Sequence, residues 1–363
     1  MKIVHLDPDD MGSPTSGGGP IRTFEIYRRL AKRHEITVLT PSFPGAKKEE
    51  VKEGIRYVRL GRKYGNHDST YFISFYFEAP FAVRRFEHDL LVEDLMPPTA
   101  ATLTPVFNRK KIVASVQWFF AKDWAKQYKI PFHWYQPFGL KLYKNFIVLT
   151  EDMEKEILKY NSKANITVIP NGLNNDFFEA VPTSEDFILY LGRIDHQQKG
   201  VDLLLEAFQK ISGKTNVNLV IAGDGMDLEK TKSEVRRLNL ESRVIFTGKV
   251  GMEKKKELLS KCRFVAVPSR YETFCMVALE AFASAKPVVA FNIPFLDVVK
   301  DEFSIRVEAF NVERYAQGML RFLSEPEVTK GMGEKAREYA RSLSWDELAR
   351  AQEEFYLKVL GKN

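Results

Sequence analysis

The sequence predicts an α/β protein with two doubly wound domains, each built on a parallel sheet. Two observations support this prediction. Short apolar runs recur along the chain and alternate with segments of helical spacing. The chain also has 363 residues, of which 44% are hydrophobic, so it is long and apolar enough for two domains that each bury a core.

The composition excludes several other classes of protein. With 21 glycines and 17 prolines, the chain resembles neither a collagen nor a disordered protein. Two cysteines, Cys262 and Cys275, are too few for a disulfide framework at this length, which indicates a reducing compartment. The sequence shows no apolar signal segment at its start and no run of 18 apolar residues. We therefore expect a soluble, cytoplasmic protein.

The first half opens with a strand–helix–strand unit. Lys2–Leu6 has the pattern of a strand, Pro20–Arg33 has helical spacing, and Glu35–Thr40 has the pattern of a second strand. A loop rich in Gly, Ser and Pro joins the first strand to the helix. Further apolar runs predict strands at Ile55–Leu60, Lys111–Val116 and Phe146–Leu149.

The second half repeats this alternation more clearly. Strands are predicted at Phe187–Gly192, Leu219–Ala222, Val244–Thr247, Phe264–Val267 and Val288–Phe291. Helical patterns lie between them at Gly200–Ile211, Asp227–Leu240, Lys254–Ser260 and Phe274–Ala285. The strands are near-continuous apolar runs, as expected when helices cover both faces of a sheet.

The domain boundary is expected between Ile169 and Thr183, where proline, asparagine and glycine interrupt the periodicity. This gives a first domain at 1–170, a second at 171–345, and a last helix at 346–363, for which packing against the first domain is one option. Ligands of doubly wound domains bind at the carboxyl ends of the strands, so we expect the site in a cleft between the domains.

The charge is unevenly distributed. Residues 1–170 hold 26 Lys and Arg against 19 Asp and Glu, whereas residues 171–363 hold 28 against 29. The whole basic excess therefore lies in the first half. It suits an anionic partner there, such as a phosphorylated acceptor, an acidic lipid surface or nucleic acid. A solvated surface rich in Lys and Glu is the alternative.

The loop Gly12–Gly19, with the sequence GSPTSGGG, ends at Pro20. Proline is favoured at the first position of a helix, and consecutive glycines let an anion approach the free backbone N–H groups there. The loop is not G-x-G-x-x-G, and no acidic residue ends the second strand, so an NAD site is not expected. We expect contact with phosphate or substrate; a flexible surface loop is the alternative.

Two cations and two carboxylates stand out in the second half. Arg193 and Lys199 lie between a predicted strand and a helix, where they could neutralise a diphosphate or could simply be solvated. Glu272 follows a strand. Glu280 lies within an apolar helix, where an unpartnered carboxylate is costly to bury. Hydrogen bonds from two ribose hydroxyls would explain Glu280, whereas a position facing water is the alternative.

These features resemble the donor domain of the family 4 retaining glycosyltransferases. The residues that carry the resemblance are Arg193, Lys199, Gly200, Gly223, Asp224, Gly225, Pro268, Ser269, Glu272 and Glu280, with the two glutamates in a Glu-x7-Glu spacing. The glycine loop and the Ile169–Gly172 hinge fit the same family, so the resemblance spans the chain. It implies the GT-B fold, in which two Rossmann-like doubly wound domains face each other across an interdomain cleft.

The resemblance also implies roles for the matching side chains. Arg193 and Lys199 would bind the donor diphosphate, Glu280 would bind the donor ribose, and Glu272 would contact hydroxyls of the transferred sugar. In this interpretation Glu272, Arg193 and Lys199 carry the catalytic roles.

Further donor contacts are implied through the backbone. The stretch beside the sugar comprises Phe274, Cys275 and Met276. Val250 would lie near the base, and Gly18 and Gly19 would approach the diphosphate from the first domain.

The sequence departs from the family pattern at two places. The family often has a histidine after the strand matched by Ile112–Val116, where this chain has Gln117. The family's Gly-Gly-x-Pro-Glu loop is replaced by Asn292–Asp297. Both departures concern the sugar and the acceptor more than the nucleotide, so whether Gln117 replaces the histidine stays open.

Aromatic residues are concentrated at 118–138, with nine in 21 residues, and again at 71–81. They predict either first-domain core or a wall for sugars or a lipid tail. The six histidines and two cysteines have no metal-ligand spacing, so no metal is expected.

The sequence therefore predicts a retaining glycosyltransferase of the hexosyltransferase type (EC 2.4), with a UDP- or GDP-sugar as donor and no cofactor. A nucleotide-sugar epimerase on the same fold and a non-catalytic sugar- or nucleotide-binding homologue are the alternatives. Nucleic-acid binding is disfavoured, because no RNA or DNA motif occurs and the basic residues are not interleaved with the aromatics. The acceptor stays open; an anionic or lipid-linked acceptor and peripheral contact with the inner face of a membrane are compatible with the basic half.

Overall fold

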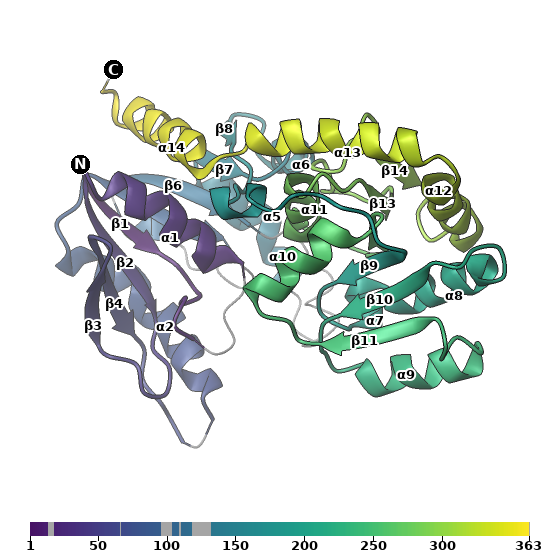
Figure 1. The fold of residues 1–363 in the computed structure, drawn as a ribbon. Coiled ribbons are helices and arrows are strands. Elements are labelled where there is room, and N and C mark those ends of the chain that lie inside the picture. Colours follow the sequence, from purple (N-terminus) through teal and green to yellow (C-terminus); the bar gives the residue numbers. More distant parts are fainter. Residues whose placement is uncertain (14–17, 66, 96–103, 109, 118–131, 363) are drawn as a thin grey trace. The chain divides into compact units, whose positions relative to one another are not determined.

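The computed structural model describes residues 1–13, 18–65, 67–95, 104–108, 110–117 and 132–362, without the side chains of 132 and 133 (Figure 1). The chain forms two compact units. Unit 1 comprises Met1–Gly172 together with Trp345–Asn363, and unit 2 comprises Leu173–Ser344. The last helix thus groups with the first half of the chain, and the units change at a residue within the expected boundary.

Unit 1 contains an eight-stranded sheet. Its strand order is β3 (Glu49–Lys52), β4 (Ile55–Leu60), β2 (Glu35–Pro41), β1 (Lys2–Leu6), β5 (Leu90–Leu95), β6 (Lys111–Val116), β7 (Asn145–Val148) and β8 (Asn165–Val168). Neighbouring strands are parallel except for β3 and β4, which are antiparallel. The parallel arrangement brings the carboxyl ends of β1, β5 and β6 to one edge of the sheet.

The helices of unit 1 are α1 (Gly19–Leu30), α2 (Ser69–Ala82), α3 (Thr104–Phe107), α5 (Phe132–Leu142), α6 (Glu151–Tyr160) and α14 (Trp345–Leu360), with a 3₁₀ turn, η1, at Val83–Arg85. Helix α14 packs along α1 (Figure 1). Trp345 and Tyr356 of α14 are buried in the same core as Tyr27 of α1, and the hydroxyls of Tyr27 and Tyr356 lie 3.2 Å apart. This shared core is why the C-terminal helix belongs to unit 1 despite its distance in sequence.

Unit 2 contains a six-stranded sheet in which all neighbouring strands are parallel. Its strand order is β11 (Val244–Gly248), β10 (Asn218–Ala222), β9 (Phe187–Leu191), β12 (Val265–Val267), β13 (Val288–Phe291) and β14 (Ser304–Val307). Every residue of β9, β12 and β13 is buried. These central strands are therefore the near-continuous apolar runs seen in the sequence.

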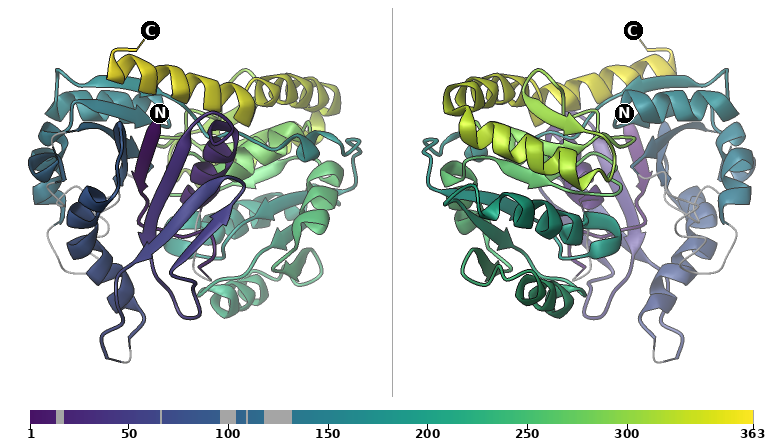
Figure 2. Two further views of the ribbon diagram at one scale, coloured as in Figure 1. Left: turned by 90° about the vertical axis from the view of Figure 1, so that its left-hand side faces the viewer. Right: turned by 90° about the vertical axis from the view of Figure 1, so that its right-hand side faces the viewer.

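Two layers of helices cover the sheet of unit 2 (Figures 1 and 2). The helices are α7 (His196–Lys199), α8 (Val201–Ser212), α9 (Leu228–Arg237), α10 (Met252–Lys261), α11 (Met276–Ala283), α12 (Val312–Ser324) and α13 (Pro326–Arg341), with a 3₁₀ turn, η3, at Asn175–Phe178. Helix α8 packs against α9 and α12, whereas α11 packs against α13. Helix α11 connects β12 to the parallel strand β13. Its first turn therefore lies at the carboxyl edge of the sheet, and its last turn lies at the amino edge.

The structure adds elements that the sequence patterns did not predict and corrects several helix boundaries. The helices predicted at Pro20–Arg33 and Asp227–Leu240 end three residues earlier, at Leu30 and Arg237. Strands β3, β5, β8 and β14 were missed, because they are short or, in β5, because the buried run ends in Glu93 and Asp94. The helix predicted at Phe274–Ala285 begins two residues later, at Met276, since Cys275 has a left-handed backbone with φ +66°. Phe274 and Cys275 therefore belong to the turn before α11.

Candidate active site

The candidate site of unit 2 lies at the carboxyl ends of β9, β10 and β12, which are adjacent in the sheet. The loops that follow these strands touch. Ile194 N donates to Asp224 O at 2.9 Å, and a Cβ atom on Gly225 would lie only 2.1 Å from Ile194 O. Only glycine permits this approach of two backbones, which explains the second glycine of the Gly-Asp-Gly turn.

Lys199 is held in place by a short capped turn. The side chain of Asp195 accepts a hydrogen bond from Gln198 N at 2.9 Å and caps α7. Gly200 follows with φ +65°, and a Cβ atom there would lie 2.1 Å from Pro268 O. The turn is also tied to the loop after β12, because Arg270 N donates to Gln198 O at 2.8 Å.

Lys199 and Glu272 form a partly buried ion pair across these two loops. Lys199 Nζ lies 2.6 Å from Glu272 Oε1, which also accepts a hydrogen bond from Ser269 Oγ at 2.7 Å. Burial opposes the charge on Lys199, but the carboxylate of Glu272 holds the pKa of Lys199 above the ordinary value. The lysine is therefore a permanent cation beside a carboxylate at physiological pH.

Arg193 lies at the same edge of the sheet as Lys199 but contacts other residues than Glu272. Its guanidinium donates to Gln198 Oε1 and lies 3.8 Å from Asp195, and 56% of its side chain is exposed. Its charge is close enough to lower the pKa of Lys199. Two neighbouring cations of this kind favour an anion between or beside them.

Glu280 is buried rather than facing water. Its carboxylate is contacted on one side by Lys255 Nζ, 2.7 Å from Oε1, whereas Oε2 is buried and has no hydrogen-bond partner among the described residues. Burial raises the pKa of Glu280, and the charge of Lys255 limits the rise. A buried carboxylate oxygen without a donor costs free energy unless a ligand supplies one.

The turn before α11 carries the three predicted backbone contacts. Phe274 and Cys275 are buried, and Met276, the first residue of α11, is half-buried. Burial and the neighbouring Glu272 raise the pKa of the Cys275 thiol well above its ordinary value. Cys275 is therefore a neutral thiol and a poor nucleophile. Val250, half-buried, follows β11 at the same edge.

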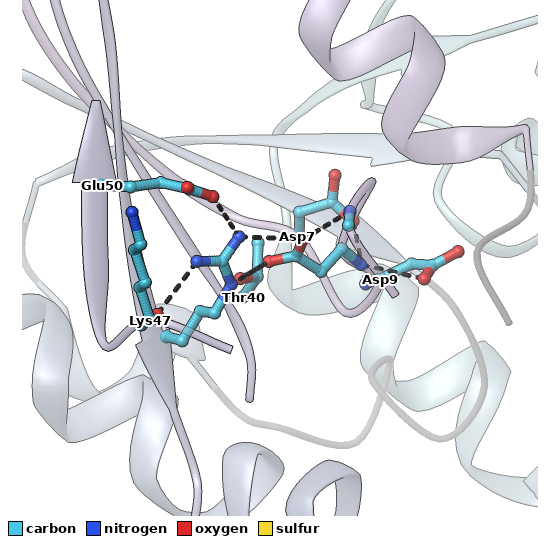
Figure 3. A network of polar contacts seen from close by, with 8 residues as sticks. Asp7, Asp9, Thr40, Lys47 and Glu50 are labelled. Carbon is cyan, nitrogen blue, oxygen red and sulfur yellow. Dashed lines mark hydrogen bonds and ion pairs between the residues drawn. The ribbon is translucent and has the colours of Figure 1, made fainter. Parts of the chain in front are cut away.

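In unit 1, the start of the glycine loop is tied to the sheet through Asp10. The carboxylate of Asp10 accepts hydrogen bonds from Gly12 N at 2.8 Å, Thr40 Oγ1 at 2.6 Å and Arg59 Nε at 2.8 Å. The Arg59 guanidinium reaches on to Lys47 O and to the Glu50 carboxylate (Figure 3). This network fixes the loop up to residue 13; residues 14–17 lie outside the described part of the chain.

The second end of the loop opens α1 beside Gln117. Gly18 precedes the helix with open space around it, whereas a Cβ atom on Gly19 would lie 3.2 Å from Gln117 Oε1. The amide of Gln117 donates to Asp94 Oδ2, and Asp94 Oδ1 lies 3.0 Å from His5 Nε2. The residue that replaces the family's histidine is thus oriented by a buried carboxylate at the end of β5.

The structure adds residues that the sequence reasoning missed. Ser269 and Lys255 contact the two predicted carboxylates, and Asp94 orients Gln117. Ser269 stands within the quoted motif, but Lys255 is one of three consecutive lysines and nothing local singles it out. Within the described residues, no group of three or more His, Cys, Asp or Glu could hold a metal ion. In the same part of the chain, no helix is long and apolar enough to cross a membrane.

Two known sequence families match almost the whole chain between them. Glycosyltransferase Family 4 matches residues 16–177, and Glycosyl transferases group 1 matches residues 173–339. The chain belongs to the group 1, family 4 glycosyltransferases. The second match includes every predicted donor-site residue of unit 2, and the two matches meet where the units change. The predicted family membership is confirmed.

Relatives with about 30% sequence identity align with about half of this chain. An uncharacterized glycosyltransferase of Methanocaldococcus jannaschii is 31% identical over 202 residues, 55% of this chain and 56% of that protein. An alpha-D-kanosaminyltransferase of Streptomyces kanamyceticus is 32% identical over 45% of this chain and 44% of its own length. The chain thus spans about half the length of the curated relatives it matches.

Solved structures of similar fold cover the chain from end to end. Sucrose-phosphate synthase from Thermosynechococcus elongatus has a TM-score of 0.82 at 20% identity and covers 99% of both chains. The Anabaena HepE protein in complex with UDP-glucose has a TM-score of 0.76 at 16% identity, covering 99% of this chain and 100% of that one. WaaG, a glycosyltransferase involved in lipopolysaccharide biosynthesis, has a TM-score of 0.72. The predicted GT-B class, with two Rossmann-like parallel sheets, is confirmed.

Proposed function

We propose that this protein is a retaining glycosyltransferase that moves a hexose-type sugar from a nucleoside diphosphate-sugar to an acceptor. The observation that carries the proposal is the unpartnered Oε2 of the buried Glu280, at the sheet edge that also holds the Lys199–Glu272 pair. Family membership and the fold shared with a UDP-glucose complex support the same reaction class.

Each polar group at this edge suits one part of such a donor. Glu280 Oε2 would accept a hydrogen bond from a ribose hydroxyl and so gain the donor that it lacks. Arg193 and Lys199 would neutralise the diphosphate. Glu272 would accept hydrogen bonds from hydroxyls of the transferred sugar, beside the backbone of Phe274–Met276. Val250 would border the base.

The reaction then depends on charge stabilisation at the leaving group. Cleavage of the sugar–phosphate bond increases the negative charge on the diphosphate, and Lys199 and Arg193 would stabilise that charge most in the transition state. Retention through a covalent intermediate would need a nucleophilic side chain at the sugar. Cys275 is held as a neutral thiol and Glu272 is already paired with Lys199 and Ser269. Attack by the acceptor on the face that the leaving group departs from is the mechanism that these residues favour.

In unit 1, a stripe of exposed apolar side chains on α2 is a candidate surface for binding the acceptor. Helix α2 buries Phe75, Ala79 and Ala82 but exposes Ile73, Phe77 and Phe81, which follow one another at intervals of four residues. Phe107 of α3 extends the stripe, with its ring 5.5 Å from that of Phe81.

Cations flank this stripe at both ends. Arg62 and Lys63 precede α2, and Arg84 and Arg85 follow it. Between residues 62 and 85 the acidic residues are Asp68 and Glu78. Arg62, Ile73, Phe77 and Arg85 also line a cavity of about 650 Å³. Exposed aromatic residues beside clustered cations suit an anionic lipid surface. We therefore infer that unit 1 contacts an anionic membrane and that the acceptor is anionic or lipid-linked.

The donor half of the proposal is tested by calorimetry with UDP and GDP, followed by incubation with labelled nucleotide sugars and analysis of the products by NMR. Binding of one nucleoside diphosphate and transfer with an unchanged anomeric configuration are expected. Conversion of the nucleotide sugar into its epimer without any acceptor would favour the epimerase instead. Absence of binding to every nucleoside diphosphate would overturn both.

A further inference from the structure

A cavity lined by several cations lies at the opposite, amino edge of the unit 2 sheet. It has a volume of about 560 Å³. Thr183 and Ser184 line it just before β9, Arg263 lines it just before β12, and Lys286 lines it just before β13. Helix α13 closes it from the side with Lys330 and Arg337. No role assigned above to the donor site involves any of these residues.

Lys286 is the least exposed cation of this cavity, at 5%. Its ammonium donates to the backbone carbonyl of Thr183, and no carboxylate of the described residues lies within ion-pair distance. Burial lowers the pKa of Lys286, and the nearby charge of Arg263 lowers it further. A buried ammonium that faces only a neutral carbonyl is costly, and an anion would offset that cost.

Two arginines that line the cavity together with Lys286 have unused donors. Arg263 Nη2 pairs with Asp186 at 2.6 Å, and Arg337 Nη2 donates to Phe178 O at 2.5 Å. The Nε atoms of both arginines are buried without a hydrogen-bond partner among the described residues. Buried donors of native proteins are nearly always satisfied, so these two point to an absent oxygen acceptor.

The cations are positioned by the backbone rather than by flexible side chains alone. Lys286 N donates to Ala281 O at 2.9 Å, in the turn that ends α11. Helix α13 approaches this turn through Gly333, where a Cβ atom would lie 2.1 Å from Ala285 O. Arg337 lies one helical turn further along α13 and lines the same cavity as Lys286.

The balance of charge favours an anion. Arg263, Lys286, Lys330 and Arg337 line the cavity, whereas the carboxylates are Glu327 and Glu334 in its lining and Asp186, which pairs with Arg263. Glu327 and Glu334 are exposed, and neither forms an ion pair with these cations within 4.0 Å in the described part of the chain. The volume lies in the range of small-molecule sites, which extends from about 300 to about 1,000 Å³.

We propose that this cavity binds a phosphate group, either as inorganic phosphate or as part of a small phosphate monoester. Lys286 supplies the buried charge, and the guanidinium groups of Arg263 and Arg337 supply N–H donors of the kind that bind phosphate oxygens. The site is independent of the donor site, although α11 connects the two: its first turns carry Met276 and Glu280, and Lys286 follows its end.

The proposal is tested by calorimetry and thermal unfolding with inorganic phosphate and with a hexose monophosphate, at an ionic strength held constant with sodium chloride. Lys286→Met and Arg337→Gln are compared with Lys214→Met, which removes an exposed lysine that lines neither cavity. Losing a hydrogen bond to a charged group should weaken binding by about tenfold or more in the first two variants. Lys214→Met should bind as the wild type does.

Phosphate bound at the donor site would give a different pattern. Lys199→Met should keep the phosphate-induced stabilisation if the amino-edge cavity is the site. Loss of the effect in Lys199→Met together with its persistence in Arg337→Gln would overturn the proposal, as would equal effects of phosphate and chloride on the wild type. Should Lys286→Met fail to fold, Arg337→Gln alone decides, since Arg337 is half-buried and its truncation opens no core cavity.

Discussion

Lys199 Nζ lies 2.6 Å from Glu272 Oε1, although the two residues are 73 positions apart in the chain. The pair joins a cation suited to a diphosphate with a carboxylate suited to sugar hydroxyls. Each residue therefore restricts the side-chain conformations of the other, and a group proposed to bind the diphosphate lies in direct contact with a group proposed to bind the sugar.

Replacing Lys199 with Ala should lower turnover by about 100- to 1,000-fold, or about 2.7–4 kcal/mol, because a cation that acts on the developing charge of the leaving group is lost. Steady-state kinetics with the identified donor measure the effect. Arg270→Gln, which alters the ion pair with Asp202 but contributes no proposed donor contact, is the control for disturbance of the loop. Normal turnover in Lys199→Ala would remove this residue from the mechanism.

Glu280→Gln should weaken the binding of nucleoside diphosphate, because the amide can offer only one acceptor oxygen where the carboxylate offers two. Glu272→Gln should leave that affinity nearly unchanged while turnover falls, since its proposed partner is the sugar. Calorimetry on both variants separates the roles. Equal nucleotide affinity in Glu280→Gln and the wild type would disprove the ribose contact.

Lys255→Met should shift the pH dependence of nucleotide binding to higher pH. Burial raises the pKa of Glu280 and Lys255 opposes the rise, so loss of the lysine raises this pKa further. Glu280 then protonates at a higher pH as the solution is acidified, and the carboxylate needed to accept ribose hydroxyl bonds is lost earlier. Calorimetry between about pH 5 and about pH 8 measures the affinity of the wild type and of the variant at each pH. The ratio of the two affinities is used, because protonation of the nucleotide affects both equally and therefore cancels. Lys254→Met, which alters only an exposed pair with Glu257, should leave the profile unchanged.

Gly200→Ala should destabilise unit 2 by more than about 1 kcal/mol, because the left-handed backbone disfavours a side chain and the new methyl group would meet Pro268 O. Gly213→Ala is the matched control, since Gly213 has an ordinary φ of −80° and open space around it. That substitution should be neutral or stabilising by up to about 1 kcal/mol. Chemical unfolding of both variants provides the comparison; similar stabilities would show that the turn before α8 is not constrained.

Vesicles of anionic lipid should bind the protein at low ionic strength and release it as salt rises from about 0.01 to about 0.15 M, where the Debye length falls from about 30 to about 8 Å. Phe77→Ser and Arg85→Glu should each reduce cosedimentation, because they remove an exposed apolar side chain and reverse a flanking charge. Val181→Ser, at an exposed apolar residue of unit 2, should have no effect. Absence of cosedimentation even at low salt would make a soluble acceptor the better hypothesis.

Local patterns in the sequence predicted most of the strands and helices that carry the site. Apolar runs identified β9, β12 and β13, since burial on both faces leaves a signal within four or five residues. The isolated charge of Glu280 in an apolar helix was likewise visible, and the structure confirms that it is buried. Of the aromatic segment at 118–138, residues 118–131 lie outside the described residues, whereas Trp134, Tyr135 and Phe138 are exposed.

The sequence by itself therefore determined the fold class, the family and the candidate donor residues, because each depends on residue types at short and regular spacing. The tertiary structure alone decided which of these residues meet. Lys255 contacts Glu280 from a different helix, Gln117 is oriented by Asp94 from a neighbouring strand, and the amino-edge cavity collects cations from two strand starts and α13. Such contacts depend on strand order and helix packing, which bring together residues separated by tens of positions. Local periodicity in the sequence therefore does not predict which of these residues will be in contact.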